Sequence, residues 1–299
     1  MNKVKLLTLS LSTIFIIGLS SCGSGNKEEG TDNSQEFDAA AEEKDLAQSI
    51  EEVVYDIPSP SEVPYLLQAT GAEFNGSLVN GVTKADSYTS SNDKAALNLG
   101  IYASDVGYLI SHEKVQDALN YMSVSKGLAV QLGLAGQFEQ NLVHRFEANL
   151  SNPDSLTHLL DHTINNSSEY LKGDGRSKIA ALLITGSFIE GLYISSQLIK
   201  NYPKDILDEE SRNAILTPLI RVILQQEQSA VEVLRMLNDM EKSDTVNDLI
   251  EQITTLNQTY AKLNIEEKIR NNQGNLVFDD VTLAEITSIV NNMRTKITD

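Results

Sequence analysis

Residues 179–199 read IAALLITGSFIEGLYISSQLI, the most apolar stretch of the chain once the first 21 residues are set aside. Glu190 is its only charged residue, and apolar side chains fall on most faces of a helix built from it. The stretch also holds Gln197, a threonine and three serines, and amphipathic segments flank it, which argues against a membrane span. We therefore expect the central helix of an all-α domain here, with Gly186 and Gly191 letting neighbouring helices approach closely.

Helical periodicity continues on both sides of this stretch. Apolar residues recur at i, i+3 and i+4 spacing, which predicts helices over 37–54, 94–111, 113–134, 137–150, 155–171, 177–202, 218–241, 245–269 and 282–297. A short helix is expected over 61–72 and a polar loop over 74–92. Thr217-Pro218 is typical of an N-cap followed by proline at the first helical position. The expected fold is all-α, a multi-helix array or bundle around residues 179–199, with its main body starting at about residue 93.

The predicted helix over 245–269 carries a regular apolar seam. Its positions alternate in spacing between three and four residues: Val246, Leu249, Ile253, Leu256, Tyr260 and Leu263. Such a seam predicts a helix that packs lengthwise and nearly antiparallel on a neighbour. It lasts for under three heptads, which disfavours a free coiled-coil dimer.

Composition limits the classes of partner. The chain has 299 residues, of which 41% are hydrophobic, enough for a sizeable core, and its formal net charge is −19. A field of that sign repels phosphate backbones and opposes adsorption to anionic lipid headgroups. Nucleic acid is therefore excluded as a partner.

The first 22 residues have the parts of an export signal. Lys3 and Lys5 precede an apolar run of 14 residues, Leu6–Leu19, which is too short to span a bilayer as a stable helix. Leu19-Ser20-Ser21-Cys22 resembles the lipobox of bacterial lipoproteins, which are cleaved just before a lipid-bearing cysteine. Cys22 is the only cysteine. The resemblance implies a signal peptide over residues 1–21, acyl chains such as palmitate on Cys22, and no disulfide.

The stretch after Cys22 has the composition of a tether. Residues 22–36 are rich in glycine, serine and charge, which predicts a flexible segment ahead of a helical domain over 37–299. Within it, Lys27-Glu28-Glu29 is similar to a signal that directs some Bacteroidota lipoproteins to the cell surface. The residue after Cys22 is Gly23 rather than aspartate, which under the enterobacterial sorting rule leaves export to the outer membrane open. We expect a cell-envelope protein anchored in the outer membrane, and the sequence leaves open which side it faces.

Three further stretches resemble an uncharacterised family of Bacteroidota all-helical lipoproteins. They read IPSP at 57–60, ALNLGIYASD at 96–105 and FIEGLYI at 188–194. The resemblance covers most of residues 57–202. It implies a helical fold and an envelope location, and it carries no activity.

Few residues form a pattern typical of catalysis or metal binding. His158 and His162 lie at i, i+4 on one helix face, a spacing that metals use, and His144 could join them. Leu159 follows the first histidine where zinc proteases need glutamate, so surface histidines are the alternative. No nucleophile elbow is present, and the lone cysteine is assigned to lipid. We expect no catalytic residue and no cofactor.

Two acids in apolar helices are the remaining candidates. Glu190 lies beside Tyr193 and Asp105 beside Tyr102, each tyrosine three positions away. A buried carboxylate must be paired or protonated, and such groups gather at binding sites. These four residues are a possible ligand site, and the alternative is a buried polar contact that holds two helices in register.

These observations favour a membrane-anchored envelope lipoprotein whose helical domain binds or scaffolds without catalysis. Its expected partners are the membrane, through the lipid anchor, and an envelope protein or small ligand that the sequence does not identify. The alternative is a metal-binding or enzymatic lipoprotein that uses His158 and His162.

Overall fold

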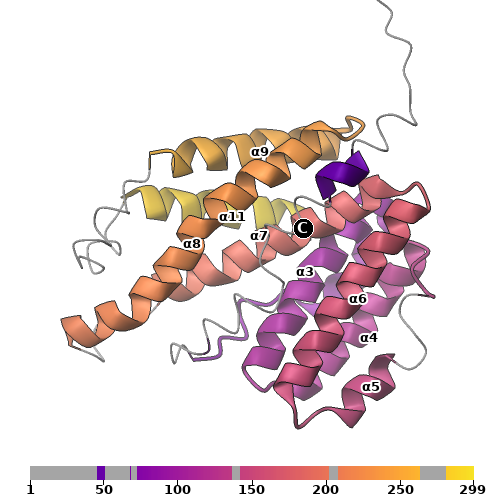
Figure 1. Cartoon of the computed structure of the whole chain (residues 1–299), viewed down its shortest axis with the longest axis horizontal. Coiled ribbons are helices and arrows are strands. Elements are labelled where there is room, and N and C mark those ends of the chain that lie inside the picture. The colour runs from indigo at the N-terminus through magenta and orange to yellow at the C-terminus, as the bar shows by residue number, and fades with distance from the viewer. Residues whose placement is uncertain (1–45, 51–67, 69–72, 137–141, 202–207, 263–280) are drawn as a thin grey trace, which may run out of the picture. The chain divides into compact units, whose positions relative to one another are not determined.

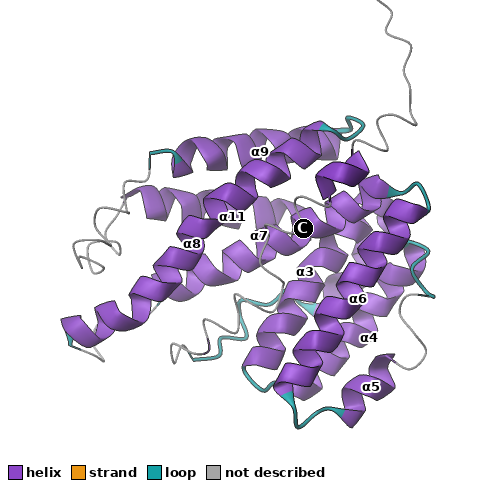
Figure 2. Ribbon diagram, viewed as in Figure 1, coloured by secondary structure: helices purple, strands orange, loops and turns teal. Residues whose placement is uncertain are grey.

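The computed structural model describes residues 46–50, 68, 73–136, 142–201, 208–262 and 281–299 (Figure 1). Every regular element in these ranges is a helix, which confirms the all-α prediction (Figure 2). The elements are the 3-10 helix η1 (Val82–Ser90) and the α-helices α3 (Asn92–Ser111), α4 (Val115–Gln131), α5 (Leu142–Ala148), α6 (Pro153–Gly173), α7 (Ser177–Lys200), α8 (Glu209–Asn238), α9 (Asp244–Tyr260) and α11 (Val281–Thr298). The expected signal peptide, tether and helix over 61–72 lie outside the described residues, apart from residue 68, which is helical.

Helix α7 is central, as expected from residues 179–199. It packs against α3, α6, α8 and α11, so both groups of helices in Figure 1 share it. One group comprises α3, α4, α5 and α6, and the other comprises α8, α9 and α11. Among the described helices α7 alone is long and apolar enough to cross a membrane. However, 83% of its most apolar stretch is buried inside the protein. That burial is typical of a core helix.

Helices α3 and α7 cross at reciprocal glycines. A Cβ atom on Gly100 of α3 would overlap the carbonyl oxygen of Leu183, and one on Gly186 of α7 would overlap that of Leu97. Beside this crossing the Ser104 hydroxyl bonds the Ser187 carbonyl oxygen at 3.0 Å. The two backbones therefore touch because neither glycine carries a side chain.

The expectations for the two glycines of α7 have different outcomes. Gly186 lets α3 approach, as expected, but a Cβ on Gly191 would meet no atom within 4 Å. The second half of the prediction is wrong. The close backbone contact of α7 with α3 lies at Gly186, five residues before Gly191.

Helix α8 begins earlier than predicted. It starts at Glu209, with the side chain of Asp208 accepting a hydrogen bond from the Ser211 amide at 2.9 Å. Thr217-Pro218 therefore lies inside the helix and is not its start. The Asp208 side chain satisfies one of the amides that the first turn of a helix leaves without a backbone partner.

The seam of α9 is buried as its spacing predicts. Its described members, from Val246 to Tyr260, are all at most 2% exposed. Helix α9 packs against α8, to which the short segment 239–243 joins it, and also against α11. The seam helix therefore packs against two neighbouring helices rather than the single one expected.

The segment 74–92 is more than a polar loop. It contains η1, and three of its apolar residues, Leu78, Ala85 and Tyr88, are buried in the core. Residues 46–50, the described part of the expected first helix, are helical, with Leu46 and Ile50 also buried. The hydrophobic core thus includes residues that precede residue 93.

Candidate functional site

A buried ion pair joins α7 to α11. Arg294 donates from Nε to Glu190 Oε2 at 3.0 Å and from Nη2 to Oε1 at 3.1 Å, a two-pronged contact. The Glu190 side chain is fully buried and that of Arg294 is 14% exposed. The guanidinium also lies 4.6 Å from the centroid of the Tyr193 ring. Burial opposes the charge on Arg294, but the attraction of Glu190 outweighs it and holds the Arg294 pKa above its ordinary value.

Asp105 of α3 is the third member of this cluster. Its carboxyl group is fully buried and hydrogen-bonded to that of Glu190, while Oδ2 accepts from the Asn80 amide at 3.1 Å. Burial, and then the charge of Glu190, raise the Asp105 pKa well above its usual range. Burial also raises the Glu190 pKa, but Arg294 opposes this. Both acids therefore hold a proton more tightly than exposed carboxyl groups do, and Arg294 counteracts this at Glu190.

The turn formed by residues 78–81 closes over these charges. Arg294 Nη2 donates to the Leu78 carbonyl oxygen at 3.1 Å, and the Tyr102 hydroxyl donates to that of Gly81 at 3.1 Å. The Asn80 side chain bonds the Tyr88 hydroxyl at 3.1 Å. We call this segment, Leu78–Gly81, the 78–81 turn. The 78–81 turn therefore covers the buried acids.

Side chains from η1 and α3 satisfy the last carbonyl groups of α11. Tyr88 and Lys84 each donate to the Thr298 carbonyl oxygen at 3.0 Å, and Asn98 donates to that of Ile297 at 3.0 Å. A helix end otherwise leaves these acceptors unsatisfied. The contacts fix the register of α11, and with it the position of Arg294.

The four candidate residues from the sequence therefore lie together. Glu190, Tyr193, Asp105 and Tyr102 surround one buried polar cluster that also contains Arg294. Sequence reasoning missed Arg294 and Asn80. The signal for Arg294 was present, because it stands one turn after Val290 in the apolar stripe of α11. Asn80 gave none, since its role depends on how a turn folds back.

The three candidate histidines lie on α5 and α6. His158 and His162 are exposed on α6, where His162 contacts Asn166 at 3.1 Å. His144 lies on α5 and contacts Glu147 at 3.3 Å. Within the described residues no group of three or more His, Cys, Asp or Glu side chains is placed to hold a metal ion.

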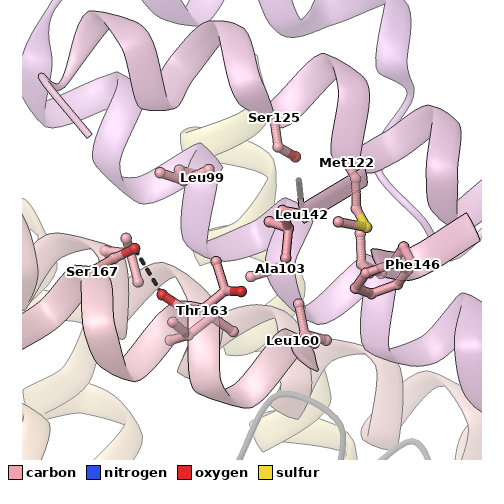
Figure 3. Close-up of a pocket in the computed structure, with 12 residues that line it drawn as sticks. Leu99, Ala103, Met122, Ser125, Leu142, Phe146, Leu160, Thr163 and Ser167 are labelled. Atoms are coloured by element: carbon pink, nitrogen blue, oxygen red, sulfur yellow. Dashed lines mark hydrogen bonds between the residues drawn. The ribbon is translucent and has the colours of Figure 1, made fainter. Parts of the chain in front are cut away.

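A small apolar cavity lies between α3, α4, α5, α6 and α7 (Figure 3). Its volume is about 40 Å³, and Leu99, Ala103, Met122 and Phe146 are among its lining residues. The hydroxyl groups at its edge bond the backbone of their own helices, as Ser167 does to Thr163 at 2.8 Å. The cavity offers little polar chemistry and is far below the roughly 300 Å³ of a typical ligand site.

A larger groove runs between the second half of α7 and the first half of α11. Its volume is about 460 Å³, within the range of ligand sites. It is lined by Ser196, Gln197, Ile199, Lys200, Leu283, Ala284, Thr287, Ser288 and Asn291. The Ser196 and Thr287 hydroxyls bond carbonyl oxygens of their own helices, so amides, Lys200 and Ser288 supply the remaining polar groups. Such a lining suits binding and contains no catalytic pair.

Comparisons with known protein families, with curated proteins and with solved structures find no match to this chain.

Proposed function

We propose that this protein is a lipid-anchored cell-envelope lipoprotein whose helical domain binds a partner or small ligand without catalysing a reaction. The observation that carries the proposal is the lipobox-like Leu19-Ser20-Ser21-Cys22 after an apolar run, with Cys22 as the only cysteine. The groove between α7 and α11 supports the binding role, because it has the size of a ligand site and a polar lining. Outer-membrane anchoring is part of the proposal.

The anchor is tested by replacing Cys22 with alanine. Labelled palmitate should enter the wild-type chain, and the Cys22→Ala chain should take up none, because the thiol is the acceptor of the lipid. The variant should also move from the membrane to the soluble fraction, since durable anchoring requires acyl chains. Palmitate labelling that survives in Cys22→Ala would overturn the assignment.

The binding role is tested by filling the groove. Ser288 is exposed on the α11 wall, so a tryptophan there should obstruct the groove while leaving the core intact. Crosslinking in intact cells should capture an envelope partner with the wild-type chain and lose it with Ser288→Trp. Ser123→Trp, on the exposed face of α4, is the matched control and should keep the partner. Equal capture by all three chains would remove the groove from the proposal.

A further inference from the structure

Among the described residues, the buried cluster has one cation, Arg294, for two acids. Glu190 uses both carboxylate oxygens on Arg294, and Asp105 is hydrogen-bonded to Glu190. Asp105 Oδ1 is buried and accepts no hydrogen bond from any N–H or O–H group in the part of the chain that the structure describes. Two carboxyl groups in hydrogen-bond contact cannot both carry a charge without a second cation. The geometry and the charges therefore require that Asp105 and Glu190 share one proton.

The 78–81 turn depends on the same groups. Its Asn80 amide donates to Asp105, and its Leu78 carbonyl oxygen accepts from Arg294. We propose that Asp105 and Glu190 hold one proton between them and that this proton latches the 78–81 turn onto α3, α7 and α11. This inference concerns a conformational device and does not depend on the lipid anchor or on the groove.

Loss of the proton to solvent would leave two buried negative charges facing one guanidinium. Opening of the turn relieves this, because water then reaches the Asp105 carboxylate. The pKa of Asp105 is raised in the closed state. The stability that Asp105 contributes to the closed turn is therefore fully present when the pH lies below the ordinary pKa of an aspartate. That stability is lost as the pH rises through the raised value. The closed state holds one proton more than the open state, so the opening equilibrium rises by up to about tenfold per pH unit.

Among the residues that the structure describes, the other ionisable groups that face the pair are Arg294 and four tyrosines. Arg294 stays charged, since Glu190 raises its pKa. Burial raises the pKa of all four tyrosines that face the pair from η1, α3, α4 and α7, which are Tyr88, Tyr102, Tyr121 and Tyr193. Lys84, Asp117 and Asp299 act on these tyrosines and do not touch the acids. The pH dependence of the turn therefore belongs to Asp105 and Glu190.

Amide hydrogen exchange on the full chain, purified in detergent, tests the latch. After correction for base-catalysed exchange, protection of the Asn80 amide should fall by up to about tenfold per pH unit as the pair loses its proton. In Asp105→Asn the amide side chain donates to Glu190 without titrating, so protection should not vary with pH. In Glu190→Gln the fall in protection of the Asn80 amide should move to lower pH. Asp105 then pairs with Arg294 and loses its proton more easily. The buried Ile253 amide of α9 is the control and should show no such fall.

Infrared spectroscopy gives a second readout that needs no exchange data. At neutral pH the wild-type chain should show the carbonyl band of a protonated, buried carboxyl group, and Asp105→Asn should lack it. Absence of that band in the wild-type chain would overturn the shared proton. An equal pH slope in Asp105→Asn, or a parallel loss of protection at Ile253, would overturn the latch.

Discussion

Replacing Asp105 by asparagine and Glu190 by glutamine in one chain should lower the free energy of unfolding by about 3–5 kcal/mol at neutral pH. Each single replacement should cost only about 1 kcal/mol or less. The asparagine in Asp105→Asn would reproduce the protonated carboxyl group, since its amide can accept from the Asn80 backbone and donate to Glu190. The glutamine in Glu190→Gln would leave Asp105 to ionise and serve as the counter-ion of Arg294. Only the double variant leaves the guanidinium buried without an anion.

Denaturant melts of the four chains form a double-mutant cycle that checks this expectation. The coupling energy should account for most of the loss. Arg294→Met is the companion variant, because it removes the cation and keeps both acids. Its loss should also reach about 3–5 kcal/mol at neutral pH and shrink in acid, where both carboxyl groups are protonated. Single losses that simply add would show that Asp105 does not take over from Glu190.

Replacing Gly186 by alanine should destabilise the protein by about 3 kcal/mol, the upper end of the usual cost of overpacking. The new methyl group would overlap the carbonyl oxygen of Leu97, so α3 and α7 would have to separate. Gly100→Ala should act in the same way from the other helix, against Leu183. Separation would also break the hydrogen bond between Ser104 and Ser187.

The matched control lies on the same helix. A Cβ at Gly191 would meet no atom within 4 Å, so Gly191→Ala should be neutral or gain up to about 1 kcal/mol from helix propensity. Midpoints of denaturant unfolding compare the three glycine variants with the wild-type chain directly. If Gly186→Ala were as stable as Gly191→Ala, the close crossing of α3 and α7 would be wrong.

Sequence patterns that are confined to a single helix predicted much of this fold. The apolar length of residues 179–199 identified the central helix, and the seam of α9 identified its buried face, because both depend on local periodicity. The start of α8 was missed because Thr217-Pro218 fits the beginning of a helix by itself. The cap at Asp208 depends on one side chain reaching the Ser211 amide.

The candidate site shows where such reasoning stops. The sequence marked Glu190 and Asp105 as acids that need a partner, since each stands alone in an apolar helix. Their being hydrogen-bonded to each other follows from the crossing of α3 and α7, which depends on how two backbones meet. The identity of the cation depends on the register of α11. Tyr88, Lys84 and Asn98 fix that register through hydrogen bonds to residues 199 to 214 positions away in the sequence.

The separation of the ion-paired residues along the chain has a consequence for biosynthesis. Glu190 and Arg294 are 104 positions apart, and Leu78 and Arg294 are 216 apart. A ribosome therefore completes α3 and α7 long before it adds the cation that both buried acids require. Until then a nascent chain that brought α3 and α7 together would confine acidic groups with no counter-ion, at a cost of several kcal/mol. Contacts of such long range also slow folding. The order of synthesis thus disfavours the packing of α3 on α7 until α11 has been made.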